Sequence, residues 1–68
     1  MQIKVFLEKQ NKEKNVSINE NSTIRELMKI LEINASEVIV VRNNEIITEK
    51  EKIKPKDTIK FLSVISGG

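Results

Sequence analysis

The chain has 68 residues, of which 38% are hydrophobic and 32% are charged. This composition is typical of one soluble globular domain, near the lower size limit for a core without disulfides or metal. Histidine, cysteine, tryptophan and tyrosine are absent, which excludes imidazole bases, thiol nucleophiles and the usual zinc and haem ligands. Packing must hold the domain together, and any chemistry must come from another kind of group.

The charges are balanced, since 12 basic and 10 acidic side chains give a net charge of +2. The densest basic stretch, residues 50–56, is interrupted by Glu51 and lacks aromatic neighbours on which bases could stack, so we expect no direct nucleic-acid partner. No apolar run approaches the about 20 residues needed to span a bilayer. A strand pattern begins directly after Met1, so we expect no signal peptide, no membrane partner and a cytoplasmic location.

The first elements form a strand, a turn and a second strand. Apolar and polar residues alternate over residues 2–8, which predicts a half-buried strand with Phe6 on its polar face. Residues 9–13 predict a hairpin loop. A second alternation at Val16 and Ile18 predicts the returning strand.

The clearest helix signal follows. Ser22 or Thr23 offers an N-cap oxygen, and Thr23 with Glu26 fits a capping box. Apolar residues then recur with the spacing of one helix face, at Ile24, Leu27, Met28 and Leu31. Asn34 is predicted to end the helix, because asparagine tolerates the left-handed conformation.

Three more strands complete the predicted order. The β-branched run at residues 38–41 predicts a strand that is covered on both faces or lies centrally in a sheet. The Asn-Asn pair at 43–44 predicts a tight turn into a short strand at 45–48. After a turn at 54–57, a last strand runs from Thr58 to the glycines. The order β-β-α-β-β-β predicts an α+β domain with one helix packed on a curled sheet.

The chain closes with Gly67-Gly68. Two glycines directly after a strand predict a flexible tail without side-chain bulk, which can be threaded into a narrow slot. The carboxylate at its tip is ionised at neutral pH and is the candidate reactive group. We expect a folded domain over residues 1–65 and a tail over residues 66–68.

Together these features resemble the ubiquitin-like β-grasp sulfur carriers. The resemblance covers the whole chain and is carried by the element order, by Val-Val-Arg-Asn-Asn-Glu-Ile-Ile at residues 40–47, by the turn ending in Asp57, and by Phe-Leu-Ser-Val-Ile-Ser-Gly-Gly at residues 61–68. That family includes the thiamin carrier ThiS, the molybdopterin synthase small subunit MoaD, the archaeal small modifier proteins and the ubiquitin-related modifier. Asn44 and Lys56 stand where the family usually has glycine.

The resemblance implies a carrier and not an enzyme. In the family, an E1-like partner uses Mg-ATP to adenylate the terminal glycine, and a sulfur donor protein then converts it to a thiocarboxylate. Gly68 would hold the acyl group, and Gly67 would give the clearance for the partner to close. The chain itself is expected to bind no cofactor or metal, and a synthase or a tRNA thiolation enzyme would accept the sulfur.

A docking surface is expected beside the tail. If the first and last strands pair centrally, as in β-grasp sheets, alternation sends Ile59 and Phe61 toward the helix. The outward residues and those that follow them are then the candidate partner-binding residues: Phe6, Lys60, Leu62, Val64, Ile65 and Ser66. The plain alternative is that isolated exposed apolar residues are normal.

Three functions stay open from the sequence. The first is a sulfur carrier for thiamin, molybdopterin or tRNA thiolation. The second is a ubiquitin-like modifier that uses the same activation to form isopeptide bonds with lysines of other proteins. The third is a β-grasp interaction domain with an inert tail, for which loss of Gly68 would not matter.

Overall fold

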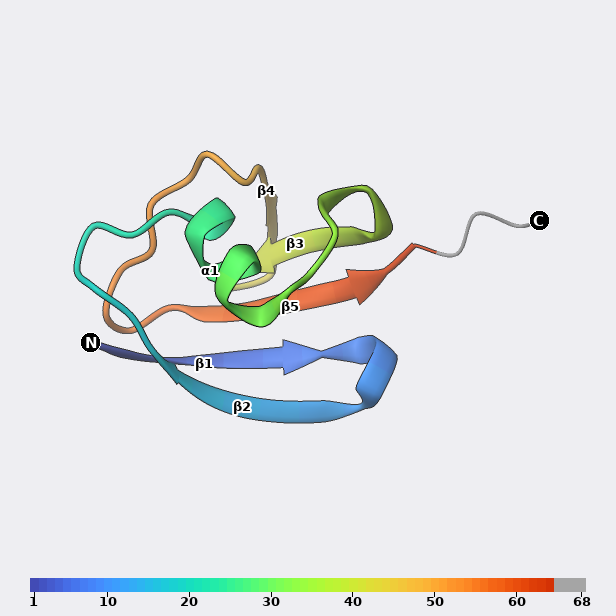
Figure 1. The fold of residues 1–68 in the computed structure, drawn as a ribbon, viewed down its shortest axis with the longest axis horizontal. Coiled ribbons are helices and arrows are strands. Elements are labelled where there is room, and N and C mark those ends of the chain that lie inside the picture. The colour runs from blue at the N-terminus through green and yellow to red at the C-terminus, as the bar shows by residue number, and fades with distance from the viewer. Residues whose placement is uncertain (65–68) are drawn as a thin grey trace.

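The computed structural model describes residues 1–64 of the chain, and these residues form one sheet with a helix across one face (Figure 1). The described elements follow the predicted β-β-α-β-β-β order, with two short 3₁₀ turns between them. They are β1 (Gln2–Leu7), η1 (Glu8–Gln10), β2 (Lys12–Ser17), α1 (Ile24–Leu31), η2 (Ala35–Glu37), β3 (Val38–Arg42), β4 (Glu45–Ile47) and β5 (Thr58–Ser63).

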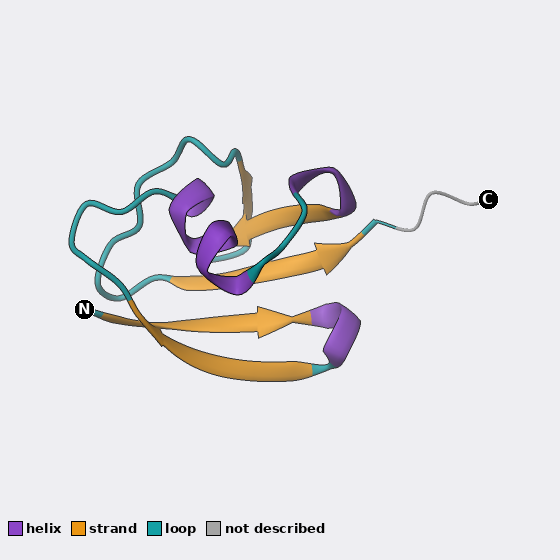
Figure 2. Cartoon of the chain, in the orientation of Figure 1, coloured by secondary structure: helices purple, strands orange, loops and turns teal. Residues whose placement is uncertain are grey.

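The strands form a single mixed sheet in the order β2-β1-β5-β3-β4. β1 and β5 run parallel to each other in its middle, and the other neighbouring strands are antiparallel. α1 lies across the face that we call the inner face (Figure 2). We call the opposite face, which no described helix covers, the outer face. The predicted ubiquitin-like β-grasp fold is confirmed.

The core lies between α1 and the inner face. Val5 and Ile59, which are partners on the two central strands, have no exposed surface, and neither has Leu27 of α1. The buried cluster comprises Ile3, Val5, Leu7, Val16, Ile18, Ile24, Leu27, Met28, Val40, Ile53, Ile59 and Phe61. Three of the four apolar residues predicted to share one face of the helix, Ile24, Leu27 and Met28, are buried in this core. The fourth, Leu31, is partly buried at its edge.

The N-terminus of α1 is capped by Thr23, one of the two predicted candidates. Its Oγ1 accepts a hydrogen bond from the backbone N–H of Glu26 at 3.3 Å, which satisfies one of the free amides of the first turn. Ser22 is buried instead, and its Oγ donates to the Asn19 carbonyl at 2.7 Å. The other half of the capping box would be a hydrogen bond from the Thr23 backbone N–H to the Glu26 side chain, and residues 1–64 do not form it.

The predicted helix end at Asn34 is wrong. The helix ends at Leu31, and the next residue, Glu32, adopts the left-handed conformation with a φ of 57°. The physical reason is Ile33, because its N–H donates to the Met28 carbonyl at 2.9 Å and its side chain packs against the core. These are the contacts of a Schellman ending. Asn34 caps η2 instead, its Oδ1 accepting a hydrogen bond from the backbone two residues on.

Strand boundaries also differ from the predictions. β2 begins at Lys12, inside the predicted loop, because η1 and the left-handed Asn11 (φ 50°) reverse the chain earlier. β4 ends at Ile47, before the predicted end at residue 48. β5 ends at Ser63 and does not continue to the predicted end at the glycines.

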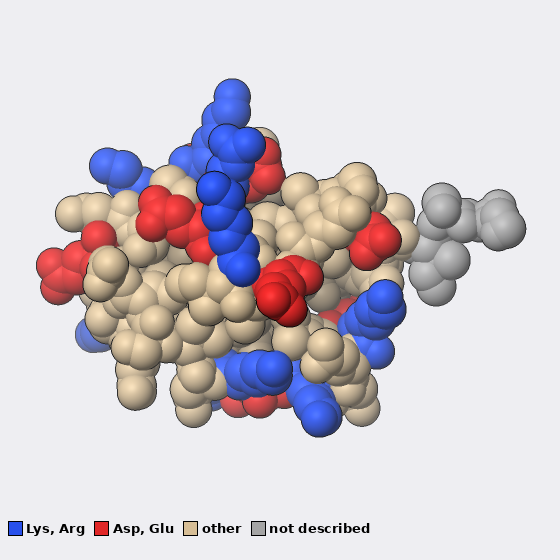
Figure 3. All heavy atoms as spheres, viewed as in Figure 1, with Lys and Arg blue, Asp and Glu red and all other residues tan. Residues whose placement is uncertain are grey.

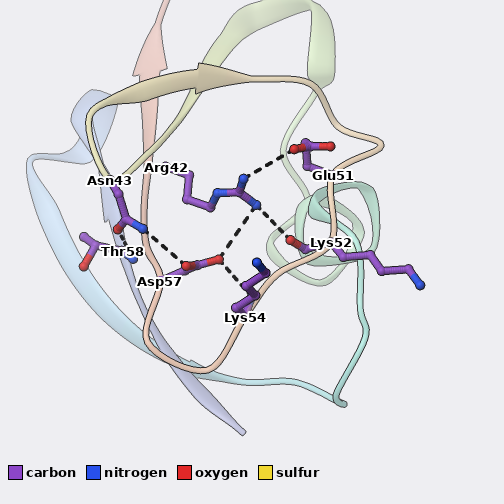
Figure 4. Close-up of polar contacts among 7 residues, drawn as sticks. All are labelled: Arg42, Asn43, Glu51, Lys52, Lys54, Asp57 and Thr58. Atoms are coloured by element: carbon purple, nitrogen blue, oxygen red, sulfur yellow. Dashed lines mark hydrogen bonds and ion pairs between the residues drawn. The ribbon is translucent and has the colours of Figure 1, made fainter.

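The Asn43-Asn44 turn is tied to the start of β5 by Asp57 (Figure 4). Both asparagines have positive φ, 50° and 71°, as a tight hairpin turn requires. The buried Asp57 carboxylate accepts hydrogen bonds from Asn43 Nδ2 at 3.3 Å and from the Lys54 N–H at 2.8 Å. Asn43 Oδ1 in turn accepts from the Thr58 N–H at 3.2 Å. The two turns that the sequence predicts are thus parts of one polar network.

We predict that Leu27→Ala lowers the free energy of unfolding by about 2–5 kcal/mol, because it leaves a cavity in a fully buried position. Ile30→Ala is the matched control on the same helix, where Ile30 is 58% exposed, and should change the free energy by less than about 1 kcal/mol. Urea denaturation followed by circular dichroism measures both. Equal losses in the two variants would contradict the packing of α1 described above.

Candidate functional site

The last backbone groups of β5 are held from both sides. The N–H of Ser63 donates to Glu8 Oε1 at 2.9 Å, and the N–H of Val64 donates to the Glu37 carbonyl at 2.8 Å. Glu8 begins η1 and Glu37 ends η2, so two 3₁₀ turns flank the end of β5 (Figure 1). We call Ser63 and Val64, with these two contacts, the exit point, because the chain continues from there to its glycines.

The residues expected to carry the chemistry, Gly67 and Gly68, lie outside the described residues. Ile65 and Ser66 also lie outside them, as does the predicted boundary between a domain and a tail. Their predicted roles remain predictions. The described residues show where the segment starts, which is at one end of the two central strands.

Phe6, Lys60 and Leu62 lie on the outer face, as predicted. Phe6 is the partner of Lys60 in the parallel pairing of β1 with β5. Phe6 and Leu62 are half-buried and Lys60 is exposed, whereas Ile59 and Phe61, which flank Lys60 in sequence, belong to the core. Both central strands therefore have the predicted orientation.

Three further aliphatic side chains share this face, and the sequence reasoning missed them. Leu62 pairs with Ile39 of β3, Lys60 pairs with Val41, and Val41 pairs with Ile46 of β4. Directly paired residues project from the same face of a sheet, and Ile39 and Ile46 are 39% and 76% exposed. We call the apolar members of this surface the outer patch: Phe6, Ile39, Val41, Ile46 and Leu62.

The β-branched run at residues 38–41 contains the signal for two of these residues, Ile39 and Val41. Its strand, β3, lies inside the sheet between β5 and β4, as one of the two predicted alternatives required. The other alternative, cover on both faces, is wrong, because Val40 is buried against the core while Ile39 stays exposed. The continuous apolar run arises because its outward residues belong to the outer patch.

Alternation predicts Val64 on the outer face as well. β5 ends one residue earlier, at Ser63, although the N–H of Val64 still donates toward the β3 side, to the Glu37 carbonyl. Val64 lines an open groove of about 610 Å³ at the exit point, together with the inner-face residues Leu7 and Phe61, and its place on the outer face stays a prediction. Its 42% exposure therefore belongs to the surface from which the chain leaves the domain.

The described surface also includes a shallow hollow of about 500 Å³ beside η2, β3 and β4, whose lining includes Ile39 and Ile46 of the outer patch. Acidic and basic side chains are interspersed over the face shown in Figure 3. Residues 1–64 hold no group of three or more histidine, cysteine, aspartate or glutamate side chains placed to bind a metal ion. No helix among them is long and apolar enough to cross a membrane. The outer patch and the exit point are thus the candidate functional surfaces.

Comparison with known proteins gives a consistent set of relatives. The chain matches the ThiS family over residues 3–68. It is 36% identical over 55 residues to sulfur carrier protein TtuB of Thermus thermophilus, a match that covers 81% of this chain and 85% of that protein. In fold it is similar to SAMP1 of Haloferax volcanii (TM-score 0.77, 16% identity) and to the thiamine biosynthesis protein ThiS of Geobacter metallireducens (TM-score 0.71, 26% identity), with 100% of each chain covered.

We predict opposite outcomes for lysine at two neighbouring positions of β3. Ile39→Lys should change the free energy of unfolding by less than about 1 kcal/mol, because the new ammonium group reaches water from the outer face. Val40→Lys should lower it by at least about 3 kcal/mol, because the charge is placed in the core. Urea denaturation of the two variants measures the difference. A smaller loss for Val40→Lys than for Ile39→Lys would mean that β3 presents the other face to α1.

Proposed function

Because the chain belongs to the ThiS family and is a sulfur carrier of that type, we propose that it carries sulfur at the carboxyl carbon of Gly68. The observation that carries this proposal is the family match, which runs to residue 68 and so includes both glycines. The chain is a carrier protein and not a catalyst, so partner enzymes activate it and receive its sulfur.

The proposed cycle has two steps at Gly68. In the first, the carboxylate attacks the α-phosphorus of Mg-ATP, pyrophosphate leaves, and an acyl-adenylate forms. In the second, sulfide (HS⁻) delivered by a sulfur donor protein attacks the carbonyl carbon, the acyl–phosphate C–O bond breaks so that AMP leaves, and loss of the S–H proton gives a thiocarboxylate. Adenylation is needed because a free carboxylate has no good leaving group. Gly67 contributes the absence of a side chain, which lets the activating enzyme close around the acyl group.

The nucleotide site is assigned to the activating enzyme. The chain contains only two glycines, at positions 67 and 68, so it has no glycine-rich loop of the kind that holds phosphate groups through backbone amides. We therefore propose that ATP and Mg bind to an E1-like partner and that this chain enters the reaction as its substrate.

The outer patch is the proposed docking surface for the partner enzymes. It covers the outward side of the central strands, and β5 leads from Lys60 and Leu62 directly to the exit point. Lys4 on the same face is already paired with Glu13 at 3.5 Å. Apolar side chains around Lys60 therefore favour a partner surface that is apolar and offers a carboxylate to Lys60. Ile65 and Ser66 extend this contact in the proposal. One surface then serves both the activating enzyme and a sulfur-accepting synthase or tRNA thiolation enzyme.

We predict that the chain purified from its native host contains a fraction whose intact mass is raised by the difference between one sulfur and one oxygen atom. Fragmentation should place that difference on Gly68. Deletion of Gly68 should abolish the species, because the acyl carbon that accepts sulfur is then lost. Intact-mass spectrometry of the two proteins makes the comparison.

The same measurement separates the alternatives. Branched peptides that join Gly68 to lysines of other proteins, without a thiocarboxylate, would favour a protein modifier. If neither species forms under any growth condition, and the Gly68 deletion retains full biological activity, the proposal is wrong and the tail is inert.

We further predict that Leu62→Lys weakens binding to the activating enzyme at least about tenfold, because it places a second charge in the apolar part of the interface. Ile30→Lys is the matched control, since Ile30 is 58% exposed on α1, in the layer on the opposite side of the sheet. Isothermal titration calorimetry with the activating enzyme measures both variants. Equal weakening by Ile30→Lys would show that docking does not use the outer patch.

A further inference from the structure

The contact between Glu8 and Ser63 fills a gap in the sheet. β1 pairs with β5 up to Leu7 and Phe61, and the chain then leaves the strand at Glu8 to form η1. Backbone N–H groups alternate in direction along a strand, and the N–H of Val64 points to the β3 side, where Glu37 accepts it. The N–H of Ser63 therefore points to the side where β1 has ended. The Glu8 carboxylate supplies the acceptor that a strand would have offered.

We propose that Glu8 is a positioning residue for the reaction at Gly68, which it serves by fixing the direction in which the chain leaves β5. This inference rests on the proposed function, because it concerns how the terminal glycine reaches the activating enzyme. The contact joins residues 55 positions apart, at 2.9 Å, and it is charge-assisted. With the Val64 contact to Glu37, it holds the exit point from both neighbouring sides.

Glu8 contributes little to the core, which separates positioning from global stability. Glu8 is exposed and is not a member of the buried cluster. Its loss should therefore affect the end of β5 locally, since strand ends open more easily than strand centres. Without the contact, the exit point is held on the β3 side alone, through the Val64 contact to Glu37, so the chain beyond it samples more directions before it enters the partner.

Loss of the Glu8 contact is expected to change the KM of the activating enzyme for this chain. The contact exists in the free chain and stays in place through the reaction, so it lowers the cost of ordering the exit point on binding and leaves the chemical step unchanged. Loss of the acceptor in Glu8→Ala should raise the KM of the activating enzyme for this chain about fivefold, equivalent to about 1 kcal/mol, with kcat unchanged.

Three variants of the full chain test the proposal. Glu8→Ala removes the acceptor, Glu8→Gln keeps an acceptor oxygen without the charge, and Glu20→Ala removes the same charge from an exposed residue in the β2–α1 connection, which lies at the other end of the domain (Figure 1). Pyrophosphate release by the enzyme that activates the wild-type chain gives KM and kcat. Hydrogen exchange of the Ser63 amide, followed by NMR, reports the contact itself.

The expected result is a raised KM and faster Ser63 exchange in Glu8→Ala, recovery of both in Glu8→Gln, and wild-type values in Glu20→Ala. Faster exchange with an unchanged KM would overturn the proposal and leave Glu8 a purely structural role. Failure of Glu8→Gln to recover KM would overturn it as well, since the charge and not the hydrogen bond would then matter. If the wild-type chain itself is never adenylated, the proposed function is wrong and this inference is lost with it. If the wild-type chain is adenylated and Glu8→Ala has the wild-type KM, only this inference is wrong.

Discussion

The parallel pairing of β1 with β5 is the constraint on which the rest of the structure depends. Parallel neighbours cannot be joined by a tight turn, so β2, α1, β3 and β4 together form the connection between the first strand and the last. Inward side chains of the pair, such as Val5 and Ile59, are the centre of the core. The outward ones are Phe6, a member of the outer patch, and Lys60, which lies beside that patch. A register shift of one residue would exchange these two sets and destroy both surfaces at once.

Local patterns in the sequence predicted most of this fold. Alternation, the helix stripe from Ile24 and the asparagine turn each arise from a few neighbouring residues, and each was confirmed. The predicted helix end failed because a tertiary contact decided it: Ile33 turns back to the core, and Glu32 accepts a left-handed conformation that its own preference disfavours. Propensity alone has no information about such a contact.

The candidate site was predictable only in part, for a related reason. Phe6 and Leu62 follow from the period of two once the central pairing is assumed. Ile39 and Ile46 require knowledge of which residue lies across from Lys60 and Leu62, and this depends on the register of two further strand pairs. The acceptor role of Glu8 depends on where β1 ends relative to β5, which no local pattern of either segment contains. Long-range register thus places the candidate surfaces, and it is the part of the structure that a single sequence shows least.

The domain also turns without glycine. All left-handed positions among residues 1–64 are occupied by asparagine or glutamate, at Asn11, Asn21, Glu32, Asn43 and Asn44. Asparagine tolerates this conformation better than most residues, so the turns form at moderate cost and the unfolded chain has less freedom to lose than with glycine. As a result, backbone without a side chain occurs at a single place along the sequence, residues 67 and 68. An enzyme entrance too narrow for a Cβ atom would therefore accept only this segment of the chain.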